Sequence, residues 1–307
     1  MRRIVLVSRI LLQYLGSTRS LPGRGAMASL ADDAAVEPTT PGRYRAHLSE
    51  DWSVWGPNGG YLAAVALRAA GHAAGGMLPV SLSCQFLAPP RYGEVEVEVS
   101  RVHGTRRAAA FHAVLRQRGR TVLAAHVWTI AGGLVGPERR WMPPPDLPAP
   151  EELPTLVDLM RRDGLPVLPI WERCYEVRLS GWPAGGWTPQ RDGVPTIRGW
   201  LRLHKPLPAG ADPWLAAARL VFAVDVVQFP AIVQAFERTT FMAPSMDLYV
   251  GFQGAAGADA GEWLLVEGEA AAATGGMLGA RARVWSDAGE LLATGGQQML
   301  YRMASPA

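Results

Sequence analysis

A glycine-rich loop that leads into an apolar segment is the first feature of this sequence suited to binding a charged group. The loop reads Gly-Pro-Asn-Gly-Gly from Gly56, and the alanine-rich residues 60–74 after it predict a helix. Backbone N–H groups at a helix start lack intrahelical partners and attract negative charge, so Asn58, Gly59 and Gly60 are candidate substrate-binding residues. A tight turn that permits close helix–sheet packing explains the same residues equally well.

Residue types that hold metals or act as nucleophiles do not occur in a recognised spacing. The six histidines are scattered without an HExxH motif, and the two cysteines, Cys84 and Cys174, match no metal or disulfide pattern. A GxSxG sequence is also absent, which disfavours a serine hydrolase of the α/β-hydrolase type. We therefore expect no metal and no cofactor.

The composition describes a globular protein. The chain has 307 residues, of which 49% are hydrophobic and 19% charged, and its net charge is +3. This length allows one large domain or two of ordinary size. Because the charge is small and no basic run occurs, nucleic acid is not an expected partner.

The N-terminus imitates a signal peptide. Its apolar run, MRRIVLVSRILLQYLG, is interrupted by Arg9 and is too short to span a bilayer. We expect residues 1–35 to be disordered or a mis-assigned start, with a cleaved signal as the alternative. No other stretch has 18 uninterrupted apolar residues, so we expect no integral membrane association and a cytoplasmic location.

The remaining sequence divides into two halves with the same plan. A proline-rich linker over residues 133–165 separates residues 36–132 from residues 166–303. In each half a helical stretch precedes four strand-like runs joined by tight turns, which predicts an α+β fold with antiparallel sheets. The helical stretch of the second half, residues 212–236, contains Pro230, which predicts a kink or break. Two strands, starting at Trp171 and Thr196, are expected to open this half.

These runs resemble the type II (TesB-like) acyl-CoA thioesterases, which have a double hotdog fold. The resemblance lies in GPNGGYLAAVALRAA and SLSCQFLAPPRYGEVEVEV in the first half. In the second half it lies in GWLRLHKPLPAGADPWLAAARLVFAVD, PSMDLYVGF and EWLLVEGEAAAATGGMLGARARVWSDAGELLATGGQQMLYR. It covers residues 40–302 and implies two antiparallel sheets, each wrapped around a central helix. Acyl-CoA is then the expected substrate and partner, with a role in fatty acid metabolism.

The resemblance also implies three catalytic residues. The family combines an Asp near the start of the second hotdog helix with a Thr on the next strand and a Gln on the last one. The matching positions are Asp225, Ser245 and Gln297. Two positions depart from the family pattern: Ser245 replaces the usual Thr, and Met277-Leu278 replaces an Arg-Gly pair.

These residue types suit hydrolysis by a bound water without a covalent intermediate. A carboxylate can act as general base, while a hydroxyl and a carboxamide each offer a donor and an acceptor to fix the water. Each residue also has a purely structural interpretation: Asp225 as a helix cap, Ser245 as a turn residue and Gln297 as a solvated strand position. Because side chains alternate along a strand, only one of Gln297 and Gln298 faces the interior, and the register favours Gln297.

Two other functions stay open. A non-catalytic acyl-CoA-binding or scaffold protein agrees with the two departures from the pattern. An enoyl-CoA hydratase or dehydratase is disfavoured because no histidine follows Asp225 within a few residues. Arg106, Arg107 and Arg120 lie on predicted turns, where they either meet CoA phosphates or are ordinary solvated charges. A monomer and a homodimer are both compatible with the sequence.

Overall fold

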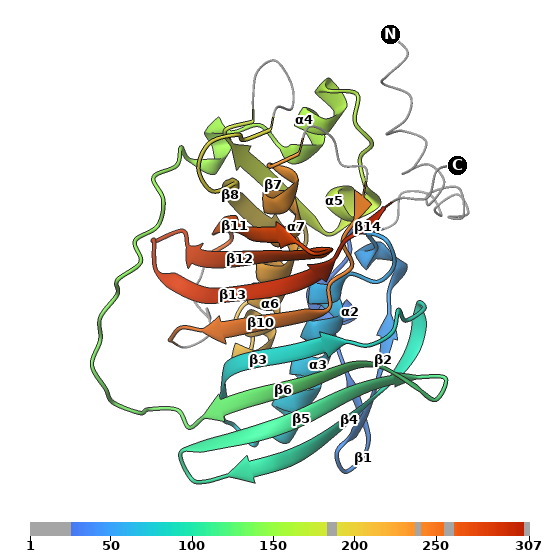
Figure 1. Ribbon diagram of the computed structural model, residues 1–307. Coiled ribbons are helices and arrows are strands. Elements are labelled where there is room, and N and C mark those ends of the chain that lie inside the picture. Colours follow the sequence, from blue (N-terminus) through green and yellow to red (C-terminus); the bar gives the residue numbers. More distant parts are fainter. Residues whose placement is uncertain (1–25, 183–188, 237–240, 255–260, 304–307) are drawn as a thin grey trace.

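The computed structural model describes residues 26–182, 189–236, 241–254 and 261–303. Its main feature is one sheet of twelve strands in which every pair is antiparallel. Two long helices lie together against one face of this sheet (Figure 1). The α+β fold predicted from the sequence is confirmed.

Each half of the chain contributes six neighbouring strands and one of the long helices. The first half has the strand order β1-β2-β4-β5-β6-β3 and the second β10-β13-β12-β11-β8-β7. The elements of the first half are β1 (Glu37–Thr40), β2 (Arg43–Leu48), α3 (Gly59–Ala73), β3 (Leu78–Phe86), β4 (Gly93–Gly104), β5 (Ala108–Gln117) and β6 (Arg120–Ile130). Those of the second are β7 (Tyr175–Ser180), β8 (Thr196–Leu203), α6 (Pro213–Val226), α7 (Gln228–Val233), β10 (Asp247–Phe252), β11 (Leu264–Thr274), β12 (Met277–Ser286) and β13 (Leu291–Leu300).

The two halves join edge to edge. β3 and β10 pair antiparallel from Ser81 with Gly251 to Gln85 with Asp247, so the two expected sheets are halves of one continuous sheet. The order of strands in the second half mirrors that of the first, with β3 and β10 as the inner edges. This arrangement protects an edge of each half that would otherwise expose unpaired backbone groups.

The long helices pack antiparallel against each other. Arg68, late in α3, forms an ion pair with Asp212, which caps the start of α6. The axes approach closely because Gly71 has no side chain: a Cβ at that position would lie 2.6 Å from the Trp214 ring. α6 is buried along nearly its whole length, which explains why it is apolar on all sides apart from Arg219 and Asp225.

This burial also explains the membrane-like composition of the second helix. Pro213–Val233 is the one stretch of the described residues long and apolar enough to cross a membrane, and 78% of its most apolar window lies inside the protein. The helix breaks at Val227, between α6 and α7, three residues before Pro230. The expected break is therefore present, since proline cannot donate the hydrogen bond that would continue the helix.

The structure corrects three local predictions. Residues 26–35 are not disordered, because α2 (Leu30–Asp33) places Leu30 in the core; residues 1–25 lie outside the described part. The strand expected from Trp171 begins at Tyr175, after the short helix α5 (Pro169–Arg173) that starts with a proline. The end of the expected linker also contains η2 (Pro150–Glu152) and α4 (Leu156–Arg162).

A second, two-stranded sheet pairs β9 (Phe241–Met242) with β14 (Arg302–Met303).

Candidate active site

Asp225 lies in the last turn of α6, immediately before the break to α7. The expectation of an acid near the start of the second helix is therefore wrong for this chain. Since α3 runs antiparallel to α6, the last turn of α6 faces the start of α3. The antiparallel packing thus brings Asp225 to the Gly-Pro-Asn-Gly-Gly loop.

The start of α3 surrounds the Asp225 carboxylate. The Asn58 side-chain amide donates to Asp225 Oδ2 at 2.9 Å, and the Gly60 backbone N–H also donates to this carboxylate. Asn58 Oδ1 accepts from the Tyr61 N–H at 2.9 Å and so caps the helix. The negative group at this helix start is therefore a side chain of the other half of the protein.

This close approach requires a glycine at position 60 and leaves little space for a side chain at position 59. A Cβ at Gly60 would lie 2.7 Å from Asp225 Cβ and 3.0 Å from the Phe222 backbone. A Cβ at Gly59 would lie 3.1 Å from the Phe86 ring and 3.3 Å from Asp225 Oδ1. Close packing therefore explains these glycines, and the same packing places them beside a charged group.

Burial controls the protonation of Asp225. The side chain is buried, and loss of solvation raises its pKa above the usual value for an aspartate. The bonds from Gly60 and Asn58 act in the opposite direction, because both donors stabilise the ionised form. The result is a carboxylate that binds a proton more readily than an exposed one, as suits a general base.

Ser245 and Gln297 form a second polar pair. The Ser245 hydroxyl donates to Gln297 Oε1 at 3.0 Å. Ser245 pairs through its backbone with Met299, so it lies beside the end of β13 that carries Gln297. Gln297 is buried and Gln298 is exposed, as strand alternation requires. Gln297 Nε2 makes one weak contact, 3.7 Å to the Met299 sulfur.

Two contacts connect the Asp225 group with the Ser245–Gln297 pair. Val224 of α6 packs against β13 at Gly295, where a Cβ would lie 2.5 Å from Val224 Cγ1. Gly295 and Gln297 are alternate residues on one face of the strand, about 7 Å apart. In addition, the ring of Phe86 touches Gly59, while the Phe86 N–H donates to the Met246 carbonyl next to Ser245.

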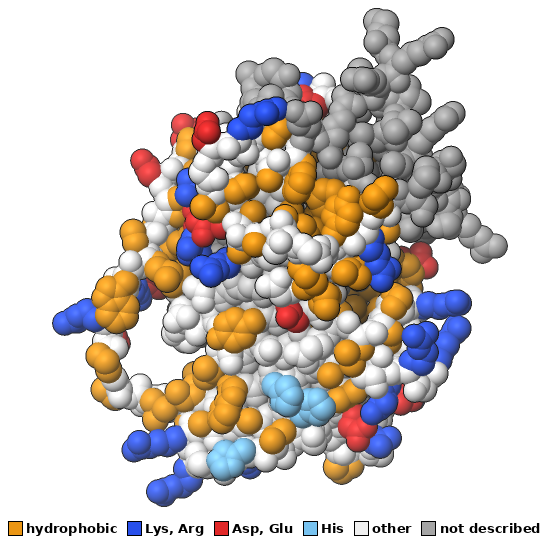
Figure 2. Space-filling view, in the orientation of Figure 1, with side chains coloured by type: hydrophobic (Ala, Val, Ile, Leu, Met, Phe, Trp, Pro, Cys, Tyr) orange, Lys and Arg blue, Asp and Glu red, His pale blue; other side chains and the backbone are white. Residues whose placement is uncertain are grey.

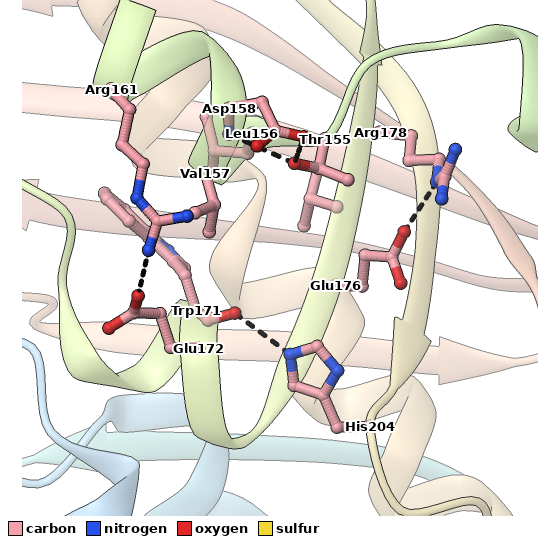
Figure 3. Close-up of a pocket in the computed structure, with 11 residues that line it drawn as sticks. Thr155, Leu156, Val157, Asp158, Arg161, Trp171, Glu172, Glu176, Arg178 and His204 are labelled. Atoms are coloured by element: carbon pink, nitrogen blue, oxygen red, sulfur yellow. Dashed lines mark hydrogen bonds and ion pairs between the residues drawn. The ribbon is translucent and has the colours of Figure 1, made fainter.

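A separate surface cavity of about 410 Å³ lies between α4, α5 and β7 (Figure 3). It contains none of the predicted site residues. Its charged groups are bonded to neighbouring side chains: Arg161 pairs with Glu172, Arg178 with Glu176, and Asp158 accepts from the Thr155 hydroxyl. His204 Nε2 lies 3.0 Å from the Trp171 carbonyl oxygen. These side chains are therefore held by their neighbours within the cavity wall.

The sequence did not indicate every residue that shapes the site. Nothing in the sequence pairs Asn58 with Asp225, and Phe86 stands in a strand without a distinctive motif. Of the departures from the family pattern, Leu278 is buried in an apolar cluster with Ile232, Phe241 and Met299. An apolar residue at this position is thus explained by its packing.

A helix in the curve of each half-sheet defines a double hotdog protein. Family models describe residues 48–130 as an acyl-CoA thioesterase N-terminal domain and residues 144–301 as an acyl-CoA thioesterase C-terminal domain. The chain belongs to this acyl-CoA thioesterase family. A comparison with curated proteins gave no match.

Solved structures agree with this fold. A hot dog fold protein of unknown function from Alicyclobacillus acidocaldarius has a TM-score of 0.75 at 22% identity, covering 92% of this chain and all of the other. The acyl-CoA thioesterase II TesB2 from Mycobacterium marinum has a TM-score of 0.71 at 20% identity, covering 90% and 98%. A putative thioesterase II from Thermobifida fusca has a TM-score of 0.73 at 19% identity, covering 91% and 100%. The likeness spans both halves of the chain.

Proposed function

We propose that this protein hydrolyses acyl-CoA thioesters to a free acid and CoA. The observation that carries the proposal is the buried Asp225 carboxylate, oriented by Asn58 and Gly60 of the other half. The pair that Ser245 forms with Gln297 of β13, the strand against which α6 packs, supports it. Family membership supplies the class of substrate.

In the proposed reaction Asp225 accepts a proton from a water molecule as that water attacks the thioester carbonyl carbon. The Ser245 hydroxyl donates a hydrogen bond to Gln297 Oε1, so its oxygen is able to accept a hydrogen bond from the same water. The Gln297 Nε2 group, which has one weak contact, is a suitable donor to the oxygen that gains negative charge. Collapse of the tetrahedral intermediate breaks the carbon–sulfur bond, and the thiolate takes up the proton held by Asp225.

We assign different roles to the residues of the helix-start loop. Both side-chain atoms of Asn58 are engaged by Asp225 and Tyr61, so we propose that Asn58 positions the carboxylate. Gly59 is the first residue of α3, where the N–H has no intrahelical acceptor. We propose that this N–H binds the thioester carbonyl oxygen, beside the Gly60 N–H that holds Asp225.

The test is a hydrolysis screen over acyl-CoA chain lengths, following the released thiol, with the wild type and Asp225→Asn. The variant is expected to lose at least about 100-fold in kcat, because a general base typically contributes that much. Near-ultraviolet circular dichroism of both proteins controls for folding. Equal turnover by the two proteins would exclude the proposed role of Asp225. Binding of acyl-CoA without hydrolysis by the wild type would instead identify a non-catalytic binding protein.

A further inference from the structure

We propose that Arg91, Arg118 and Arg120 form the site that binds the phosphate groups of the CoA nucleotide. This inference rests on the proposed function, because it places the far end of the same substrate. The three side chains are exposed and come from two neighbouring segments: the loop between β3 and β4, and the turn between β5 and β6.

One glutamine holds these two segments together. Gln117 Oε1 accepts from the Arg91 N–H at 2.7 Å, and Gln117 Nε2 donates to the Arg91 carbonyl at 2.8 Å and to the Glu94 carbonyl at 3.0 Å. Gln117 itself pairs with Arg120 across the β5–β6 hairpin. Arg118 and Gly119 form the turn with φ of 51° and 77°, the left-handed values of a type I′ hairpin. These hydrogen bonds therefore hold the backbones of the three arginines close together.

Two contacts place this region at the rim of the candidate active site. The Tyr92 hydroxyl donates to Ser53 Oγ, at the start of the loop that ends with Asn58. At the end of β3, the Phe86 ring contacts Gly59 while its backbone pairs with Leu123 of β6. Arg120 lies three residues before Leu123, about 10 Å along the same strand.

That spacing matches the shape of the substrate. The pantetheine arm of CoA joins the thioester sulfur to the first phosphorus through about thirteen bonds, the length of about four residues of extended chain, or roughly 15 Å. With the thioester at Asp225, the pantetheine arm is long enough for the phosphates to reach the rim where the arginines lie. Guanidinium groups bind phosphate oxygens with two parallel hydrogen bonds, which a single ammonium group does not do.

The charges of this rim are available to a ligand. Among the described residues, Arg91, Arg118 and Arg120 form no ion pair. The neighbouring acids are matched by other arginines: Glu94 pairs with Arg45 at 3.3 Å, and Glu98 with Arg43 at 3.6 Å. Figure 2 shows basic side chains gathered along the right-hand edge of the molecule, where Figure 1 places the β3–β4 loop and the β5–β6 turn.

These three arginines lie far from Arg106 and Arg107, the other pair suggested by the sequence. Arg106 and Arg107 lie in the β4–β5 turn, at the other end of β5, about 30 Å from the β5–β6 turn by strand length. Figure 1 shows that turn at the left-hand end of the sheet, away from the end of β3. Of the three arginines named for CoA phosphates, the structure thus favours Arg120 alone and adds Arg91 and Arg118.

The experiment compares the double variant Arg118→Asn/Arg120→Thr with the control Arg106→Asn/Arg107→Thr, which removes the same charge from the distant turn. Asn-Gly is a preferred type I′ turn and Thr suits a strand, so the hairpin is expected to remain folded. Binding of CoA and of pantetheine is measured by calorimetry, and hydrolysis is measured with acyl-CoA and acyl-pantetheine. We expect the double variant to bind CoA about tenfold more weakly and to raise KM for acyl-CoA by a similar factor. Binding and hydrolysis of the pantetheine compounds should be unchanged.

The outcomes separate this site from the proposed reaction. Arginine-dependent CoA binding without any hydrolysis by the wild type would support the phosphate site and exclude the hydrolase function. Hydrolysis of acyl-CoA with a KM equal in the wild type and the double variant would overturn the phosphate site alone. Equal loss in the control variant would also overturn it, because general charge would then explain the effect. A wild type that neither binds CoA nor hydrolyses acyl-CoA would overturn both proposals.

Discussion

The Asn58 side-chain amide donates a hydrogen bond to Asp225 Oδ2 at 2.9 Å, inside the protein, between residues 167 positions apart in the chain. This bond connects the start of α3 in one half with the last turn of α6 in the other. The two residues do not occupy equivalent positions of the duplicated fold, because Asn58 caps the start of α3 whereas Asp225 lies in the last turn of α6.

The first prediction concerns this donor. Replacing Asn58 by Ser keeps a side chain that caps a helix but removes the amide that bonds Asp225. Because that bond lowers the pKa of Asp225, its loss should raise the pKa and move the acid limb of the rate profile to higher pH. We expect kcat/KM at neutral pH to fall about tenfold and the free energy of unfolding to fall by about 1–3 kcal/mol, because the buried carboxylate loses a hydrogen-bond donor. An unchanged pH profile would contradict the positioning role.

The second prediction concerns the pH dependence of stability. An unfolded chain loses the Asp225 proton near pH 4, whereas the buried side chain keeps it to higher pH. Between these two pKa values the folded state binds more protons, so the contribution of Asp225 to stability falls as the pH rises. The stability of Asp225→Asn relative to wild type should therefore increase from pH 4 to pH 7. Urea unfolding of both proteins at each pH measures this difference, and a constant difference would refute the predicted shift.

The third prediction separates the two glycines of the loop. Gly60→Ala forces a Cβ against Asp225 and the Phe222 backbone and should destabilise the protein by about 1–3 kcal/mol. In Gly59→Ala the added methyl group meets the movable Phe86 ring and the carboxylate. This variant should therefore lose activity while its free energy of unfolding changes little. Gly136→Ala, at a position with free space, is the control for both measurements. Equal effects of the Gly59 and Gly60 substitutions would argue against a separate role for Gly59.

The fourth prediction uses the neighbouring glutamines of β13. Gln297→Ala removes the partner of Ser245 and the proposed carbonyl donor, so kcat should fall by about 10- to 100-fold. Gln298→Ala removes an exposed side chain from the opposite face and should leave kcat within about twofold of wild type. The same assay with Ser245→Thr, which restores the usual family residue, should retain activity. A larger effect at Gln298 than at Gln297 would invalidate the assigned orientation.

Several features of the fold could be read from local sequence. The alternating EVEVEVSRV run, the Gly-Pro-Asn-Gly-Gly loop before an alanine-rich segment and the repeated helix-then-four-strands order predicted the α+β architecture and most element positions. Each of these signals depends on residues close together in the chain, so it can be recognised from the sequence alone. The short helix α5 was missed because five residues are too few to show a helical period.

The sequence by itself determined the duplicated plan, the family resemblance and the candidate residues Asp225, Ser245 and Gln297. The tertiary structure decided which groups surround them. Only the antiparallel packing of α3 and α6 places Asn58 and Gly60 against Asp225, and only the hairpin register places Arg120 on the site side while Arg106 lies at the far end. The reason is physical: such contacts join residues far apart in the chain, and their partners are selected by packing and strand pairing across the whole domain.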